Sequence, residues 1–134
     1  MDLLGSSSFK QLESGIQASA ARHQVITNNI ANVETPYYKR SDVEFESLLR
    51  NEMNESTLTG TRTNSRHFYI GPSQSIPEYR IVQDESTVMG NNQNNVDIDV
   101  EAAKQAENQL RYYTYIQQAN HHINMMRTAI DSRR

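Results

Sequence analysis

The sequence has no cysteine, no tryptophan, five glycines and three prolines among its 134 residues. The absence of cysteine excludes disulfides, thiolate metal sites and cysteine nucleophiles. Hydrophobic residues make up 36% of the chain, against roughly 45–50% in ordinary globular domains (a range that counts glycine). A deep core shared by the whole chain is therefore not expected, and the apolar residues must be concentrated in a few segments.

An excess of charge of one sign is also lacking. The chain has 13 Lys and Arg residues against 16 Asp and Glu, for a net charge of −3 at pH 7. Neither a nucleic-acid partner nor a polybasic membrane anchor is expected, because both need a basic patch. No run of 18 apolar residues is present, which argues against direct membrane insertion. The first residues have neither the basic nor the apolar region of a secretory signal, so we expect cytosolic residence or export without a cleaved signal.

Residues 1–35 form the first of three zones, and their apolar residues recur with the period of a helix. We call this row the N-terminal seam, with Ser19 and His23 as its two polar interruptions: Phe9, Leu12, Ile16, Ser19, His23, Ile26, Ile30 and Val33. Alternating spacings of three and four residues are a heptad pattern, which predicts a helix of roughly 36 Å that packs along its whole length. Ser8 with Gln11 fits a capping box at its start.

Residues 96–134 form the last zone and repeat the pattern. The C-terminal seam consists of Ala103, Ala106, Leu110, Tyr113, Ile116, Ala119, Ile123, Met126 and Ile130. Asp97, Asp99 and Glu101 supply a helix cap and a negative first turn, and a terminal pair of arginines complements the other end of the helix dipole. The pattern predicts a helix near 50 Å long, at about 1.5 Å per residue.

Residues 36–95 lie between these helices and differ in composition. SDVEFESLLRNEMN, residues 41–54, predicts a short helix capped by Ser41 with Glu44 at its third position. Two short β-prone runs follow, HFYI at 67–70 and EYRIV at 78–82, and they are expected to pair loosely as a hairpin.

The stretch GNNQNN, residues 90–95, is typical of a polar linker.

The sequence as a whole predicts a mainly α fold. Long N- and C-terminal helices form a coiled-coil-like axial core, with a small irregular or β-hairpin insert between them.

The N-terminal seam runs into NNIANVETPYYKR, residues 28–40, where a helix that could continue is cut off. Pro36 has no backbone N–H and disfavours helical geometry at Thr35, so the helix must stop within a residue or two. The asparagine side chains before it can bond the last unpaired carbonyls of the helix or a neighbouring molecule.

This stretch resembles the motif that ends the N-terminal helix in the axial proteins of the bacterial flagellum, which comprise rod, hook and hook-associated subunits. The matching positions are Asn28, Asn29, Ala31, Asn32, Thr35, Pro36 and Tyr38. Residues 96–130 resemble the C-terminal helix of the proximal rod subunit, with AENQLRY and MMRTAI as the distinguishing runs. The run DVEFESLL at 42–49 agrees with the same family.

The resemblance implies a structural subunit of the flagellar basal-body rod, the drive shaft that transmits torque and surrounds the export channel. It implies four partners: other copies of the chain, other rod subunits, the protein that joins rod to ring, and the flagellar export apparatus. It implies type III export without a cleaved signal, and no cofactor. The low apolar content then predicts that the free subunit is partly disordered and orders on assembly.

One position departs from the family's pattern. Where the family usually has glycine after Thr-Pro, this chain has Tyr37. A positive φ at a bulky residue costs on the order of 1 kcal/mol or more. We therefore expect either a different type of turn or an extended conformation for Tyr37.

Other interpretations of the same residues lead to other functions. The seams alone equally permit an intramolecular coiled coil, whereas the motif favours assembly contacts made by their apolar members. A cytosolic helical binding module, a chaperone or regulator built as a two-helix hairpin, is the alternative function, with Tyr112, Tyr113 and Tyr115 beside Arg111 as its binding hot spot.

Neither an enzyme nor a metal site is indicated. Asp97 and Asp99 precede a helix, where capping is the commoner role, and no phosphate-binding loop or nucleophile motif is present. His121 and His122 are adjacent, so on a helix they point about 100° apart and cannot share an ion.

Overall fold

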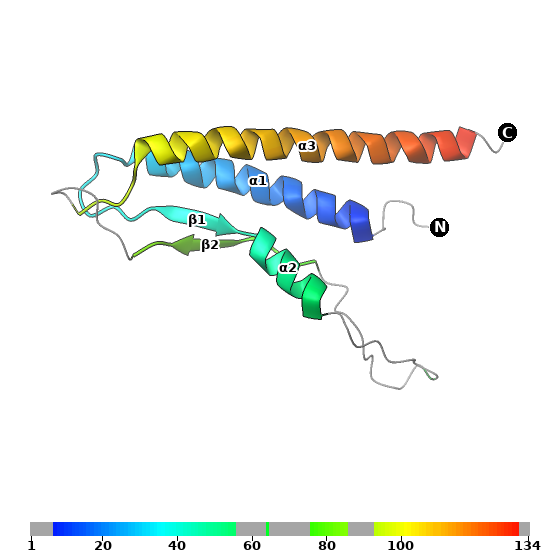
Figure 1. Cartoon of the computed structure of the whole chain (residues 1–134), viewed down its shortest axis with the longest axis horizontal. Coiled ribbons are helices and arrows are strands. Elements are labelled where there is room, and N and C mark those ends of the chain that lie inside the picture. The colour runs from blue at the N-terminus through cyan, green and yellow to red at the C-terminus, as the bar shows by residue number, and fades with distance from the viewer. Residues whose placement is uncertain (1–6, 56–63, 65–75, 86–92, 132–134) are drawn as a thin grey trace.

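Long helices at the two ends of the chain and a small sheet between them make up the structure, a computed structural model that describes residues 7–55, 64, 76–85 and 93–131 (Figure 1). In chain order the elements are α1 (Ser7–Ala31), β1 (Ser41–Glu44), α2 (Glu46–Glu55), β2 (Arg80–Gln83) and α3 (Ile98–Asp131). The predicted mainly α fold with a β-containing insert is confirmed.

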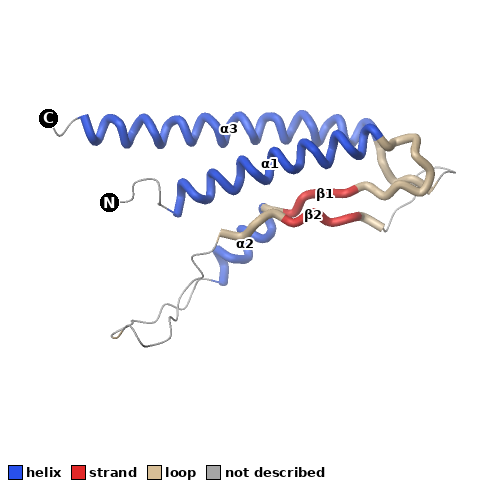
Figure 2. Tube along the Cα trace, turned by 180° about the vertical axis from the view of Figure 1, so that it is seen from behind, coloured by secondary structure: helices blue, strands red, loops and turns tan. Residues whose placement is uncertain are grey.

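The helices α1 and α3 lie side by side and antiparallel, and α3 projects past the start of α1 (Figures 1 and 2). They approach closely at Gly15, where a methyl group would lie 3.1 Å from the Tyr115 ring. Counting outward from this contact places Ser7 opposite about residue 123, since both helices rise equally per residue. Residues 123–131, the α3 overhang, therefore have no α1 beside them.

The hydrophobic core is small. Its buried side chains are Ala18, Ala21, Val25, Ile26, Val43, Phe45 and Val96. Most come from one face of α1 and from the strand that packs on it, and only Val96 adjoins α3. Within the described ranges, no helix is long and apolar enough to cross a membrane.

The insert corrects the sequence prediction for residues 41–44, which form β1 and not the first turn of a helix. Val43 and Phe45 are both buried, so an alternation of period two faces α1 and decides the local structure against the capping pattern. The short helix begins only at Glu46 and ends at Glu55.

The second strand of the insert pairs with the first. β2 runs antiparallel to β1, with Ser41 opposite Gln83 and Glu44 opposite Arg80. Residues 80–82 of the run EYRIV and its neighbour Gln83 therefore pair with residues 41–44, a pairing that the sequence did not predict, while the predicted hairpin with HFYI stays a prediction. HFYI itself lies outside the described residues.

The start of α3 confirms one capping prediction. The Oδ1 atom of Asp97 accepts hydrogen bonds from the backbone N–H groups of Asp99 (2.9 Å) and Val100 (3.3 Å). The cap predicted for the first helix was wrong, because α1 already begins at Ser7 and Ser8 lies within it. The terminal arginine pair lies outside the described residues.

Candidate assembly site

The motif at residues 28–38 lies at the corner where α1 ends beside the start of α3 (Figure 1). Its centre is Asn29, whose side chain is fully buried. The Nδ2 of Asn29 donates to the Ser41 carbonyl (2.8 Å) and to Glu101 Oε2 (2.9 Å). Its Oδ1 accepts from the Ser41 N–H (3.0 Å) and the Tyr38 hydroxyl (3.2 Å). One amide thus ties the end of α1 to β1 and to α3.

We call the buried contacts of Asn29 with Tyr38, Ser41 and Glu101 the polar junction. Glu101 is its charged member and is only 1% exposed. Among the described residues its Oε1 has no hydrogen-bond partner, but it lies 3.6 Å from Arg40 Nη1 and 3.7 Å from Lys104 Nζ. A buried carboxylate needs such compensation, because removing one partner of a buried pair is strongly destabilising. The junction consequently fixes where α3 starts relative to α1.

Asn94 closes the end of α1 from across the chain. Its Nδ2 lies within hydrogen-bond distance of three carbonyl oxygens, those of Asn32 (2.9 Å), Val33 (2.9 Å) and Thr35 (3.0 Å). These carbonyls belong to the turn that follows the last residue of α1, Ala31, so Asn94 holds the chain in place where it leaves the helix. Both Asn94 and Asn95 are buried, so treating the end of GNNQNN as a mere linker was wrong.

The remaining motif residues divide by exposure. Asn32 and Tyr38 are half-buried, whereas Asn28, Ala31, Thr35 and Pro36 are exposed. Asn32 donates from Nδ2 to the Asn28 carbonyl at 2.8 Å, as expected of an asparagine in the last helical turn. Asn29 instead bonds β1 and α3, contacts that only the folded chain reveals.

Tyr37 adopts a left-handed conformation with φ of 61°, and 72% of it is exposed. The expectation that it would avoid a positive φ was wrong. The turn after Pro36 keeps the geometry that glycine suits, and the tyrosine is accommodated in it. A non-glycine residue in this region is destabilised by roughly 1–2 kcal/mol, because its Cβ crowds the following carbonyl.

Replacing Tyr37 with glycine is expected to raise the free energy of unfolding by about 1 kcal/mol, because the Cβ clash is removed. Tyr37→Ala is the matched control, since it removes the ring but keeps Cβ. Urea unfolding of both variants checks the prediction. Equal stabilities for the glycine and alanine variants contradict backbone strain at this position.

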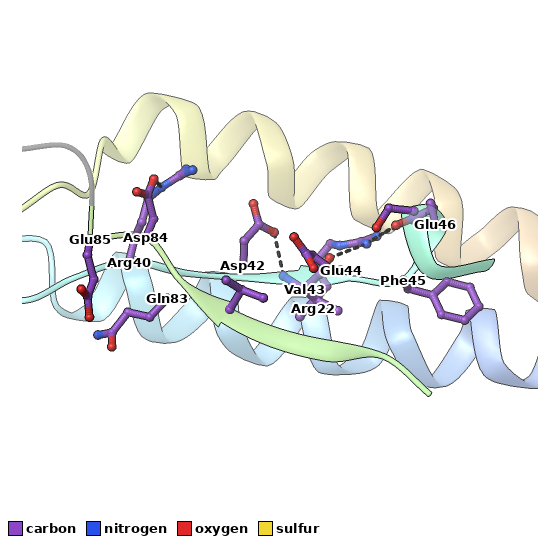
Figure 3. Close-up of a pocket in the computed structure, with 12 residues that line it drawn as sticks. Arg22, Arg40, Asp42, Val43, Glu44, Phe45, Glu46, Gln83, Asp84 and Glu85 are labelled. Carbon is purple, nitrogen blue, oxygen red and sulfur yellow. Dashed lines mark hydrogen bonds and ion pairs between the residues drawn. The ribbon is translucent and has the colours of Figure 1, made fainter. Parts of the chain in front are cut away.

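Ion pairs at β1 and at the start of α2 join the insert to both long helices. Arg22 of α1 forms two hydrogen bonds to the Glu46 carboxylate, at 2.6 and 2.9 Å (Figure 3). Arg111 of α3 reaches the same carboxylate at 2.6 Å, and Lys104 donates to Asp42 Oδ2 at 2.9 Å. Paired, charge-assisted bonds of this kind carry geometric specificity. The start of α2 is therefore held in one place against the helical pair.

The hollow shown in Figure 3, of about 800 Å³, lies against these pairs between β1, β2 and the start of α2. Its arginines are already engaged, Arg22 with Glu46 and Arg40 with Asp84 (3.1 Å). We assign no ligand to it.

The stability of the fold is expected to fall at both extremes of pH. Burial alone would raise the pKa of Asp42 and Glu46, but the cations that bond them, Lys104 and Arg22 first, lower each pKa below its ordinary value of 3.8 or 4.5. Their stabilisation is thus present above pH 4.5 and is lost as the pH falls through the lowered values. Burial, and then the Glu101 charge, raise the pKa of Tyr38 above 10.0, so its contribution is lost as the pH rises through that higher value.

Thermal unfolding between pH 2 and 11 checks this dome-shaped profile. Glu46→Gln is expected to flatten the acid limb, and Tyr38→Phe the alkaline limb. An unchanged profile in both variants contradicts the assignment.

The structure places the two seams differently. In the N-terminal seam Ile26 is buried, and Phe9, Leu12, Ile16, Ile30 and Val33 are half-buried. In the C-terminal seam Ile116 and Met126 are half-buried. Ala119 is half-buried as well, and Ala103 and Ala106 are exposed. Among the larger exposed members the exposed fractions are 71% for Leu110, 56% for Tyr113, 47% for Ile123 and 61% for Ile130.

The reason lies in the face that α3 turns toward α1. That face carries Glu101, Asn108 and Tyr115, so these contacts and not the heptad pattern set the rotation of the helix. Leu110 and Tyr113 point elsewhere, with no cover in the part of the chain that the structure describes. The geometry leaves an apolar surface suited to packing against another molecule.

The histidines of α3 do not form part of this site. His121 is exposed and His122 half-buried. Among the residues that the structure describes, no group of three or more His, Asp and Glu side chains is arranged to hold a metal ion.

Comparison with known proteins matches the chain to proteins of the flagellar rod. A family model described as "Flagella basal body rod protein" matches residues 11–39. The chain is 35% identical over 127 residues to the flagellar basal body rod protein FlgB of Bacillus subtilis, covering 95% of each. It is 38% identical over 98 residues to FlgB of Borreliella burgdorferi, covering 69% of this chain and 72% of the relative. With FlgB of Aquifex aeolicus the identity is 31% over 112 residues, covering 84% and 83%.

Proposed function

The chain belongs to the flagellar basal body rod proteins, as a member of the kind named FlgB, and on that premise we propose how it takes its place in the rod. It is a structural subunit of the bacterial flagellar basal body. Its α1 and α3 pack with those of its neighbours around the export channel, in the proximal part of the drive shaft. Contacts between unlike surfaces repeat without closing and so generate a helical array.

The observation that carries this proposal is the contrast between the two faces of α3. The face toward α1 is polar, and Glu101 and Asn108 each form a hydrogen bond to α1 from it. Leu110 and Ile130, on the C-terminal seam, are 71% and 61% exposed. A helix whose polar side chains face the rest of its own chain and whose apolar side chains are exposed is suited to packing those apolar side chains against a partner.

The partners we propose are other copies of this chain, the other rod subunits, the protein that joins rod to ring, and the export apparatus. Export through that apparatus needs no cleaved signal. The small core supports a free subunit that is partly disordered and orders on assembly.

A cytosolic helical binding module is not favoured, because the relatives are rod proteins over most of the chain. The family is a structural one and not a family of enzymes. Far-UV circular dichroism of the dilute subunit distinguishes the two functions. A rod subunit that orders on assembly is expected to gain helix in the rod, whereas a binding module is fully helical when free.

Mass spectrometry of purified hook–basal bodies, from cells that express the chain at its native level, tests the proposal. We expect a few copies in each particle and none in the filament fraction. Finding the chain only in the soluble cytosol of cells with intact rods contradicts the proposed function.

A further inference from the structure

The two-stranded sheet has two edges, and they differ in whether their backbone groups are bonded. β1 lies beside α1, and β2 is the outer strand (Figures 1 and 2). At the edge of β1, the Ser41 N–H and carbonyl bond the Asn29 side chain at 3.0 and 2.8 Å. The Val43 carbonyl accepts from Arg22 at 3.0 Å, and the Val43 N–H donates to Asp42 Oδ1 at 2.8 Å. The edge of β1 is therefore closed by side chains of the same chain.

The edge of β2 is open. The Asp84 N–H donates to the Arg40 carbonyl at 2.9 Å, and hydrogen-bonded and non-hydrogen-bonded pairs alternate along an antiparallel ladder. Ile81 and Gln83 therefore direct their N–H and carbonyl groups away from β1. Within the described residues these outward groups have no hydrogen-bond partner. Unpaired backbone groups along an edge strand are a template for another strand.

The side chains of β2 and its neighbour also favour a contact. Tyr79 is 40% exposed and Ile81 is 55% exposed. Arg80 is exposed and forms no ion pair with any residue that the structure describes. Because the edge of β1 is closed, the described strand of a second copy that has an open edge is again β2. Antiparallel pairing of two identical edges gives a contact with two-fold symmetry.

Charge selects the register of such a pair. Outward-facing residues must lie opposite outward-facing residues, so the two-fold axis passes through residue 80, 81 or 82. An axis at residue 80 sets two Arg80 side chains opposite each other, and an axis at residue 81 sets Glu78 opposite Asp84. Like charges directly opposite each other are destabilising. An axis at residue 82 instead sets Arg80 opposite Asp84 on both sides, so opposite charges favour this register.

We propose that β2 of one free subunit pairs with β2 of a second copy, antiparallel and centred on Val82, to form a four-stranded sheet. Arg80 of each copy then bonds Asp84 of the other. A carboxylate accepts more than one hydrogen bond, so Asp84 keeps its 3.1 Å contact with Arg40.

This contact goes beyond the proposed function, because it describes the subunit before assembly. A two-fold contact uses the same surface on both copies and closes on itself, whereas a rod grows by contacts that do not close. The pair is therefore a dimer of the free subunit, and it must separate before either copy joins a helical array.

The absence of cysteine allows a direct test. In the proposed dimer the two Val82 residues face each other at a non-hydrogen-bonded position, where Cα atoms lie about 4.5 Å apart, within reach of a disulfide. Mild oxidation of the purified full chain with Val82→Cys is expected to give a covalent dimer. Glu44→Cys is the matched control, since it is exposed on the same face of the sheet but lies on β1, and no covalent dimer is expected.

Sedimentation velocity measures the dimer without a cysteine. The dimer fraction of the wild-type chain is expected to rise with protein concentration and to fall with added salt. Arg80→Glu is expected to weaken dimerisation about tenfold, because two attractive pairs become repulsive. Arg80→Lys, which keeps the charge, is expected to retain most of the dimer.

The backbone contact is tested by Ile81→Pro. Proline removes an N–H that faces away from β1, so the pairing of β2 with β1 is expected to persist while the dimer is lost. Far-UV circular dichroism checks that the variant is folded. A folded Ile81→Pro chain that still dimerises overturns the proposal.

Three other results also overturn it. A wild-type chain that is monomeric at every concentration leaves the edge to another occupant, such as residues 67–70, its partner in the sequence prediction. Equal dimerisation of the Arg80→Glu and Arg80→Lys variants contradicts the register. A Val82→Cys cross-link in purified hook–basal bodies contradicts a dimer of the free subunit. Absence of the wild-type chain from those particles counts against the proposed function instead.

Discussion

Replacing Asn29 with alanine is expected to lower the free energy of unfolding by about 4 kcal/mol, because four hydrogen bonds are lost inside the protein. The Ser41 N–H and carbonyl lose their side-chain partner, and the buried Glu101 carboxylate loses the hydrogen bond to its Oε2. Total stabilities of small domains are about 5–15 kcal/mol, so the variant is expected to lose a large part of its stability and to swim less well. Urea unfolding followed at 222 nm, and swimming in soft agar, measure the two effects.

Asn28→Ala is the matched control for this prediction. Asn28 precedes Asn29 in the same motif, but its side chain is exposed. We expect a change of less than about 0.5 kcal/mol, as at most surface positions. If the two alanine variants are equally stable, the polar junction does not hold the fold together.

Ile123→Asp and Met126→Asp are expected to block rod assembly and so abolish motility, while the subunit is still exported. Ile123 is 47% exposed in the single chain, so a charge there leaves the free subunit intact. Once covered by a neighbour, an unpaired carboxylate loses its hydration, which makes the packed state unfavourable by several kcal/mol. Electron microscopy of basal bodies and detection of the exported subunit in the culture medium measure the two outcomes.

Asn120→Asp serves as the control, because it adds the same charge at an exposed polar position of α3 outside the C-terminal seam. It is expected to leave swimming unchanged. Normal motility in both seam variants means that the overhang does not pack against a neighbour.

The long helices were predictable because each carries its period over more than twenty residues. The structure of the insert was not predictable, because the choice between strand and helix depends on only four residues, 41–44. The run SDVE fits both a capping box and a strand, and only the burial of Val43 and Phe45 against α1 selects the strand. Tertiary packing decides such short segments, whatever their local preference.

The motif located the polar junction but did not reveal its partners. Asn29 and Glu101 are 72 residues apart, and no local pattern links them. Glu101 looked like one acidic residue of a first helical turn, and Asn94 like part of a linker. Their roles follow from the antiparallel packing of α1 and α3, which brings the two ends of the insert together.

That meeting point has a consequence for how such chains can vary. The segment that leaves the helical pair, at Arg40, is hydrogen-bonded to the segment that returns to it, at Asp84 and Asn95. The Asp84 N–H donates to the Arg40 carbonyl, the Arg40 N–H to Asn95 Oδ1, and Asn95 Nδ2 to the Asp84 carbonyl. The two ends of the insert are thereby hydrogen-bonded to each other, independently of the residues between them. A graft between α2 and β2 that keeps Phe45 and Glu46 in place is expected to leave the helical pair unchanged, so the outer surface of the subunit is free to diverge while its axial packing stays fixed.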